Sequence, residues 1–204
     1  TDRERLLGPQ HPDTLTSRNN LALCLKSVGR ATEALPLYEK NLTDRERLLG
    51  PQHPDTLTSR NNLALCLKSV GRATEALPLF EKTLTDLKRL LGPEHPDTFT
   101  CRNNLAACLA SGGGSEEALP LFEQSLTDQE RVLGPDHPDT LISRNNLAGC
   151  LELVGRTGEA LLLYEQNLTD RERVLGPDHP DTLTSRNNLA ACLESMANGR
   201  DGGS

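Results

Sequence analysis

The histidines are the residues of this chain whose type could most readily support catalysis or metal binding. Each one lies in a His-Pro-Asp-Thr motif that recurs every 42 residues, at His11, His53, His95, His137 and His179. A metal ion such as zinc needs several ligands around one point, and a ladder with one histidine per repeat keeps its members apart. The histidines therefore predict a repeated structural element, and neither a metal site nor a cofactor is expected.

Five of the cysteines recur with the same period, at Cys24, Cys66, Cys108, Cys150 and Cys192. Equivalent points of stacked units lie farther apart than the roughly 7 Å between Cα atoms that a disulfide tolerates, so buried thiols in a reducing compartment are expected. Most of a helix, about 20 Å at helical rise, separates His11 from Cys24, which excludes a Cys–His nucleophile within one repeat. Cys101 replaces the serine of the other repeats, and it could be either a reactive thiol or another buried one.

The glycine-rich segment 112–115, Gly-Gly-Gly-Ser, is the one candidate for a phosphate-binding loop. It lacks the lysine that follows in such loops, and it falls where a turn between two helices is expected. The segment is interpreted as a weakly packed turn. No catalytic residue is predicted, and the chain is not expected to be an enzyme.

Composition restricts the classes of partner. The chain has 204 residues, a net charge of -7, no tryptophan and few aromatic residues, whereas nucleic-acid-binding proteins need a basic face and often stacking platforms. No apolar run reaches the length of a membrane span, and the first residues are too polar for a signal peptide. We therefore expect a cytoplasmic protein with no nucleic-acid or membrane partner.

Each repeat predicts two helices. The first, helix A, opens at His-Pro-Asp, because proline suits the first helical turn and aspartate favours the positive end of the helix dipole. Apolar residues then follow a helical stripe from Leu15 to Val28. Gly29 ends helix A, and the second helix, helix B, runs from about Ala31 to a stop at Gly50. A fixed period of this kind indicates stacked helix pairs that contact their neighbours.

The repeat resembles the tetratricopeptide repeat. The residues that carry the resemblance in the first unit are Leu21-Ala22, Leu25, Gly29, Ala34 and Tyr38. The 42-residue period, with Leu-Gly-Pro-x-His-Pro-Asp between units and Asn-Asn-Leu-Ala in helix A, is similar to the kinesin light chain subtype. The resemblance implies an all-α fold, a right-handed superhelical solenoid of antiparallel helix pairs.

The expected organisation follows the repeat. Residues 1–8 are expected to be the C-terminal half of a preceding helix B, residues 177–197 an unpaired helix A, and residues 198–204 a flexible tail. The four complete units between them are expected at 9–50, 51–92, 93–134 and 135–176.

The resemblance implies that A helices line a concave groove that binds peptides. The groove positions on which we rely are an asparagine row, two threonines and four charged residues: Asn19, Asn61, Asn103, Asn145, Asn187, Thr16, Thr58, Lys26, Lys68, Glu152 and Glu194. An asparagine amide both donates and accepts hydrogen bonds, so a row can hold a peptide backbone without demanding one sequence. The alternative is a solvated polar stripe copied with the repeat. The second asparagine of each pair, such as Asn20, is expected to bond between neighbouring helices.

The charge of the groove changes sign along the chain. Lysine occupies one position in the first two repeats, and glutamate occupies it in the last two. This pattern would direct the acidic part of a ligand toward the first two repeats.

A row of arginines departs from the family pattern, which has a large apolar residue at that site. It comprises Arg18, Arg60, Arg102, Arg144 and Arg186. We expect each arginine to lie against the aromatic ring of helix B, Arg18 on Tyr38 for example. The alternative is a basic ladder that binds phosphate or carboxylate.

Taken together, the sequence predicts a non-catalytic scaffold that binds a peptide or protein segment along helices A. The alternative is a structural or regulatory spacer within a larger signalling protein. That spacer could self-associate head to tail through its uncapped ends.

Overall fold

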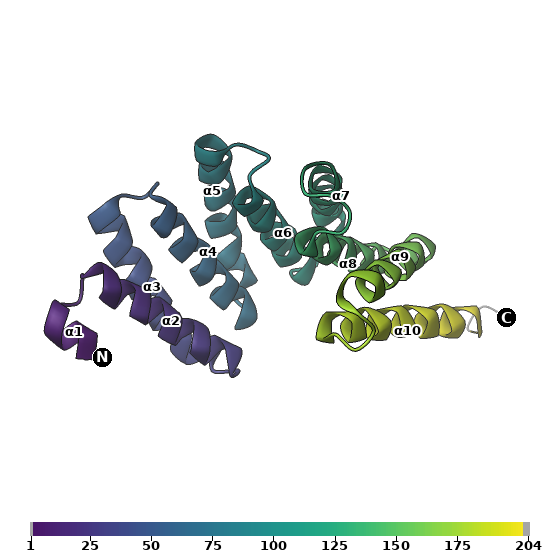
Figure 1. Cartoon of the computed structure of the whole chain (residues 1–204), viewed down its shortest axis with the longest axis horizontal. Helices are drawn as coiled ribbons and strands as arrows, with labels where there is room; N and C mark the ends of the chain where they lie inside the picture. The colour runs from purple at the N-terminus through teal and green to yellow at the C-terminus, as the bar shows by residue number, and fades with distance from the viewer. Residues whose placement is uncertain (1, 202–204) are drawn as a thin grey trace. The chain divides into compact units, whose positions relative to one another are not determined.

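The protein is an all-α repeat structure, as expected. A computed structural model describes residues 2–201, with side chains described for residues 4–198, and the helices in that range follow one another without a strand (Figure 1). The helices are α1 (Asp2–Leu7), α2 (Pro12–Ser27), α3 (Ala31–Leu49), α4 (Pro54–Ser69), α5 (Ala73–Leu91), α6 (Pro96–Ser111), α7 (Ser115–Val132), α8 (Pro138–Leu153), α9 (Thr157–Leu175) and α10 (Pro180–Asp201). Helices α2, α4, α6, α8 and α10 are the A helices, and α3, α5, α7 and α9 are the B helices.

The histidine of each repeat is the N-cap of an A helix, a role that the sequence analysis did not assign. The Nδ1 atom of His11 accepts a hydrogen bond of 3.2 Å from the backbone N–H of Asp13. His53 makes the same bond to Asp55. The proline that follows occupies the first helical turn, where its missing N–H costs nothing. The His-Pro-Asp motif therefore starts a helix.

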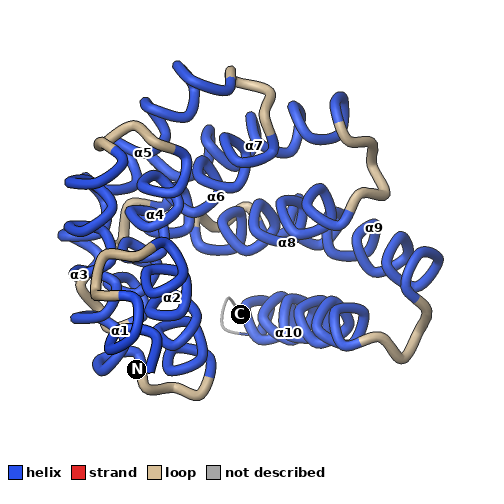
Figure 2. Tube along the Cα trace, turned by 60° about the vertical axis from the view of Figure 1, so that its left-hand side comes forward, coloured by secondary structure: helices blue, strands red, loops and turns tan. Residues whose placement is uncertain are grey.

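Glycine ends both kinds of helix, as the sequence predicted. Gly29 has φ of 80° and follows α2, and Gly50 has φ of 89° and caps α3. A residue with a side chain is strained in this left-handed region, so glycine permits the sharp turn. Because both turns are short, consecutive helices pack antiparallel (Figure 2).

The first compact unit, residues 1–108, packs through alanines and aromatic residues. In it α2 packs on α3, α3 on α4 and α4 on α5. Ala22, Ala34 and Ala64 are fully buried, and their small side chains let the helices approach closely around Tyr38 and Phe80. Each helix thus contacts its neighbours in sequence, as in a repeat array.

Three arginines of the row, Arg18, Arg60 and Arg144, form buried ion pairs, so the expected stacking on the helix B aromatic ring is wrong. Arg102 does lie over a ring, 5.8 Å from its centroid, but the ring is that of Phe99 on its own helix. Arg60 on α4 is 1% exposed. Its Nη1 donates to Asp86 Oδ2 on α5 at 2.9 Å, and its Nη2 donates to Glu46 Oε1 on α3 at 3.3 Å. A carboxylate offers a guanidinium stronger, directional bonds than a ring face does, and the aspartate lies one helix further along the chain.

The same arrangement recurs at Arg18 and Arg144. Arg18 donates to Asp44 at 2.6 Å and to the carbonyl oxygen of Pro9 at 3.0 Å. Arg144 donates to Asp170 at 2.6 Å. The terminal nitrogens of Arg18, Arg60 and Arg144 are therefore paired inside the protein, which argues against a ligand-binding basic ladder at these three positions.

The second compact unit, residues 109–204, repeats this packing. Helix α7 packs on α8, α8 on α9 and α9 on α10. Helix α10 continues through Asp201, whereas the sequence placed the end of this helix at residue 197. No proline interrupts residues 198–201, and each added residue of a helix gains one backbone hydrogen bond. Residues 202–204 of the expected flexible tail lie outside the described residues.

Candidate functional site

The candidate site is one face of the A helices. Residues spaced like Thr16, Asn19 and Lys26 share a face of a helix, because their positions differ by nearly whole turns. We call this the A-helix face. In the first unit it carries Thr16, Asn19, Lys26, Thr58, Asn61, Lys68, Thr100 and Asn103; in the second unit it carries Asn145, Glu152, Asn187 and Glu194.

Successive A helices are joined by an asparagine ladder. The Nδ2 of Asn62 on α4 donates to Oδ1 of Asn19 on α2 at 3.1 Å, and Asn104 donates in the same way to Asn61 at 3.2 Å. In the second unit Asn188 donates to Asn145 at 2.8 Å. Asn62, Asn104 and Asn188 therefore bond between neighbouring helices, as expected. The same expectation for Asn20 is wrong, because Asn20 is exposed and no A helix of the described chain precedes α2.

The ladder also gives a structural role to the first asparagine of each Asn-Asn pair. Each uses its oxygen to accept from the next A helix, which fixes the orientation of the amide. The Nδ2 group of Asn19, Asn61 and Asn145 makes no hydrogen bond within the described part of the chain. In the first unit Asn19 and Asn61 thus present two oriented amide donors, and in the second unit Asn145 presents one. Asn187 is exposed, and Asn103 is 8% exposed.

The two threonines expected in the groove are exposed on the same face. The hydroxyl of Thr58 donates to the carbonyl oxygen of Pro54 at 3.1 Å, inside its own helix. It still has lone pairs that can accept a hydrogen bond.

The two lysines of the A-helix face, Lys26 and Lys68, lie close enough to repel each other. Partial burial lowers the pKa of Lys68, and the positive charge of Lys26 lowers it further. Neither ammonium group has an ion-pair partner among the described residues. This pair is therefore the part of the A-helix face best suited to an anionic group.

The glutamates of the second unit differ from each other in their surroundings. The hydroxyl of Tyr164 on α9 donates to Glu152 Oε2 at 2.8 Å. Burial, together with this bond, raises the pKa of Tyr164. Glu152 is thus held by the protein, whereas Glu194 is exposed on α10.

Contacts between each B helix and the next A helix differ along the chain. At the α3–α4 interface Arg45 Nη1 donates to Ser59 Oγ at 3.0 Å and to the carbonyl oxygen of Asp55 at 2.8 Å. Arg171 makes the same two bonds at the α9–α10 interface, to Ser185 and Asp181. At α5–α6 the corresponding residues are Leu87 and Cys101.

Cys101 is a buried thiol, so the alternative of a reactive one is wrong. Its side chain is 2% exposed, and Sγ lies 3.6 Å from the carbonyl oxygen of Phe80. Burial raises the pKa of Cys101 to about 12. The thiolate, which is the nucleophilic form, is therefore scarce at neutral pH.

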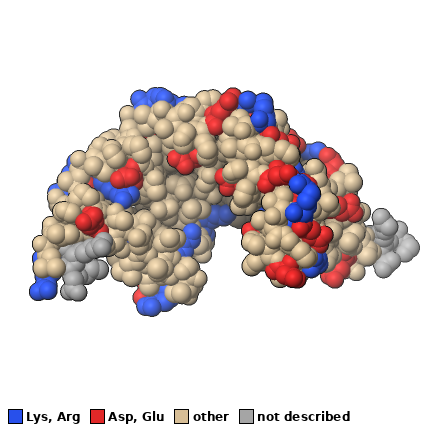
Figure 3. Space-filling model, in the orientation of Figure 1, with Lys and Arg blue, Asp and Glu red and all other residues tan. Residues whose placement is uncertain are grey.

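Neither the distribution of charge nor the placement of metal-ligating side chains indicates another candidate site among the described residues. On the face seen in Figure 3, acidic and basic side chains are interspersed with uncharged ones. Among the described residues there is no group of three metal-ligating side chains, and no helix in that range is long and apolar enough to cross a membrane.

Comparisons with known proteins identify the repeat. The tetratricopeptide repeat model matches residues 19–85, 60–127 and 113–169. The chain is similar to two crystal structures of a kinesin light chain-like protein of Podosopora anserina with nearly identical TPR-like repeats. Identity is 29% in both, coverage 94% of this chain and 90% of that one, and the TM-scores are 0.78 and 0.77.

More distant structures share the fold. BtubC (BKLC) of P. vanneervenii is 22% identical, with a TM-score of 0.76 over 96% of this chain and 80% of that one. PlcR of Bacillus thuringiensis, solved with the peptide PapR7 and DNA, is 18% identical, with a TM-score of 0.64 over 91% of this chain and 64% of that one. No match to a curated protein sequence was found.

Proposed function

Because the chain belongs to the tetratricopeptide repeat family, we propose that it is a non-catalytic scaffold that binds an extended peptide segment along the A-helix face. The observation that carries the proposal is the pair of amide donors on Asn19 and Asn61, on neighbouring A helices of the first unit. A peptide backbone offers one carbonyl acceptor per residue, and donors repeated on neighbouring helices suit such a ligand. The crystal structure of PlcR, which has this fold, contains a peptide.

The lysine pair gives the ligand a direction. Lys26 and Lys68 lie in the last turns of α2 and α4, whereas Asp13 and Asp55 lie in the first turns of the same helices. Within the first unit, one edge of the A-helix face is therefore basic and the other acidic. We expect the acidic part of the ligand at the lysine edge, and the attraction should weaken with salt.

The partner is proposed to be a protein segment in the cytoplasm. The chain's net charge of -7 does not suit a phosphate backbone. Four of the repeated thiols, those of Cys66, Cys108, Cys150 and Cys192, are buried as expected, whereas Cys24 is exposed, contrary to the expectation. Free thiols are typical of a protein in a reducing compartment.

The test is capture of peptides from a random library by the chain and by Asn61→Asp. Aspartate keeps the oxygen that accepts from Asn104 and removes the free Nδ2 donor, so the ladder survives while the ligand contact is lost. The control is Asn20→Asp, which adds the same charge on an exposed residue outside the ladder. Helicity measured by circular dichroism verifies folding in each variant.

We expect peptides that bind the parent and Asn20→Asp, and bind Asn61→Asp at least several-fold more weakly. Equal binding by all three would place the ligand away from the A-helix face. No capture by the parent would refute peptide binding and favour a spacer role.

A further inference from the structure

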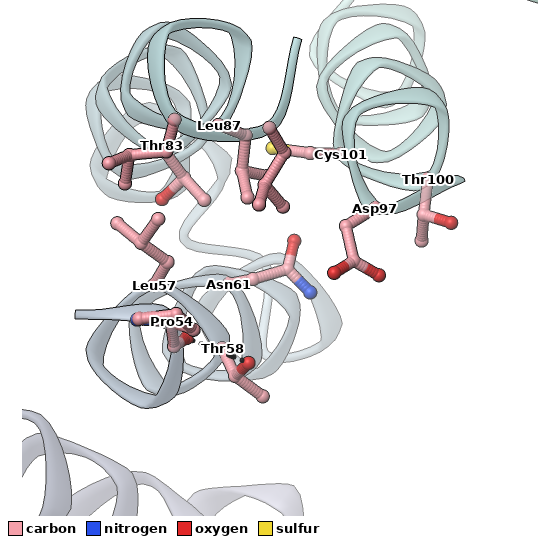
Figure 4. A pocket seen from close by; sticks show the side chains of 11 residues that line it. Pro54, Leu57, Thr58, Asn61, Thr83, Leu87, Asp97, Thr100 and Cys101 are labelled. Atoms are coloured by element: carbon pink, nitrogen blue, oxygen red, sulfur yellow. Dashed lines mark hydrogen bonds between the residues drawn. The ribbon is translucent and has the colours of Figure 1, made fainter. Parts of the chain in front are cut away.

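An apolar cavity of about 150 Å³ lies between α4, α5 and α6 in the first unit. Figure 4 shows Leu57 and Asn61 of α4 facing Leu87 and Thr83 of α5, with Cys101 and Asp97 of α6 beside them. Its inner wall is buried, because Leu57, Cys101 and Leu87 are 2%, 2% and 7% exposed. Its rim is exposed and comprises Pro54, Thr58, Asp97 and Thr100. The cavity thus opens at the acidic edge of the A-helix face.

The cavity results from three departures from the repeat, at Leu87, at Cys101 and at Thr83, which replaces the Asn41 of the previous repeat. At the α3–α4 interface the long side chain of Arg45 reaches Ser59 and the first turn of α4. Leucine at position 87 is too short to reach the first turn of α6, and Cys101 removes the hydroxyl that an arginine would use. Leucine in place of arginine and cysteine in place of serine remove hydrogen-bonding groups from the same place. The space is therefore apolar, whereas the equivalent place one repeat earlier is filled by a guanidinium group.

We propose that this cavity binds one aliphatic side chain of the peptide ligand, such as leucine, isoleucine or methionine, with a basic residue next to it. The inference rests on the proposed function and specifies its ligand. An apolar cavity of this size accommodates a benzene-sized molecule, which is larger than the side chain of leucine. Burial of that side chain against Leu57, Leu87 and Cys101 supplies the affinity.

Residues at the rim of the cavity can contact the parts of the ligand beside the anchored side chain. The free Nδ2 of Asn61 lies at the wall, where it can donate to a carbonyl group of the peptide beside the anchored residue. Asp97 is the charged residue of the lining, and its side chain is 70% exposed. An adjacent lysine or arginine of the ligand can pair with it. The acidic part of the same ligand would then extend toward Lys26 and Lys68.

The chain itself supplies the variant that fills the cavity. Leu87→Arg combined with Cys101→Ser recreates the pair that the α3–α4 and α9–α10 interfaces already contain. The introduced guanidinium would occupy the cavity and bond to the introduced hydroxyl. We expect this double variant to fold, because the same two residues are compatible with the repeat at two other places.

The probes are acetylated, amidated octapeptides with a serine and glutamine background and a central Leu-Lys, Ala-Lys or Leu-Glu pair. Titrations are followed by NMR of the Asn61 side-chain amide and by calorimetry. The parent should bind Leu-Lys about tenfold more tightly than Ala-Lys and several-fold more tightly than Leu-Glu. The double variant should bind Leu-Lys and Ala-Lys equally.

Three results would overturn the assignment, and they differ in what else they affect. Equal binding of the Leu-Lys and Ala-Lys peptides to the parent removes the anchor site and leaves the proposed function intact. If none of the three peptides binds while library capture is still observed, the anchor site is again refuted and the proposed function stays intact. If the parent dimerises without peptide and the double variant does not, the cavity belongs to an interface between copies of the chain.

Discussion

The α3–α4 interface is held by a buried arginine and serine, whereas the α5–α6 interface is apolar and contains a cavity. The two interfaces use the same helices of the repeat at the same positions, so the backbone does not explain the difference. Arg45, Ser59 and Asn41 correspond to Leu87, Cys101 and Thr83 at the second interface. A repeat array can therefore acquire a distinct site by changing a few facing side chains, because each interface is packed independently of the others.

The largest expected effect concerns the reactivity of Cys101, which has no counterpart at the polar interface. Its raised pKa, about 12 against about 8.5 for a free thiol, lowers the thiolate fraction about 10³-fold at pH 8. Alkylation by iodoacetamide should be slower by about that factor than in the urea-unfolded chain. Peptide mapping by mass spectrometry measures it, and native alkylation at the unfolded rate would contradict the burial.

The raised pKa of Cys101 also makes the stability of the fold depend on pH. The native thiol stays protonated to a higher pH than the unfolded one, so burial of Cys101 stabilises the fold below about pH 8.5. This contribution declines as pH rises toward 12.

The second prediction concerns the arginines that both kinds of interface share. Arg60→Ala removes the buried partner of Asp86 and of the carbonyl oxygen of Pro51, and leaves Asp86 only the exposed Arg89 at 3.8 Å. The loss should cost about 3–5 kcal/mol of unfolding free energy. The control is Arg186→Ala, because Arg186 is 46% exposed and pairs with Glu172 alone among carboxylates of the described chain. Its loss should cost less than about 1 kcal/mol. Urea unfolding compares the two, and equal costs would refute the role of burial.

The third prediction separates two of the changes that distinguish the interfaces. Leu87→Arg alone places a guanidinium against a thiol and should destabilise the chain by about 1–3 kcal/mol. Adding Cys101→Ser should recover a large part of that loss, which corresponds to a coupling energy of about 0.5–3 kcal/mol. A double-mutant cycle by urea unfolding measures the coupling. Additive effects would show that Leu87 and Cys101 changed independently.

The smallest expected effect concerns the asparagine ladder, which crosses both kinds of interface unchanged. Asn62→Ala removes the bond to Asn19 and should cost about 1 kcal/mol. Asn20→Ala is the matched control, because Asn20 is exposed and makes no side-chain bond in the described structure. Thermal unfolding should show no measurable shift for the control. A similar loss in both variants would mean that helix propensity, and not the ladder, determines the effect.

The sequence by itself determined the helices and the order in which they pack. Proline and glycine at fixed points of the repeat set the helix boundaries, since their backbone preferences act locally. The N-cap role of His11 was equally local, although the motif was interpreted through its proline and aspartate alone. The A-helix face followed from the helical period and the family resemblance.

Only the tertiary structure decided which side chains meet. Arg60 bonds to Asp86, 26 residues later, and Asn62 bonds to Asn19, 43 residues earlier. No local preference encodes such distances in sequence. Arg60 was expected to stack on the helix B ring, and it bonds to a carboxylate of the next B helix instead. Cys101 was visible in the sequence as an exception, but its facing partner, Leu87, lies on another helix. A cavity forms where two such exceptions face each other, and that depends on packing in three dimensions.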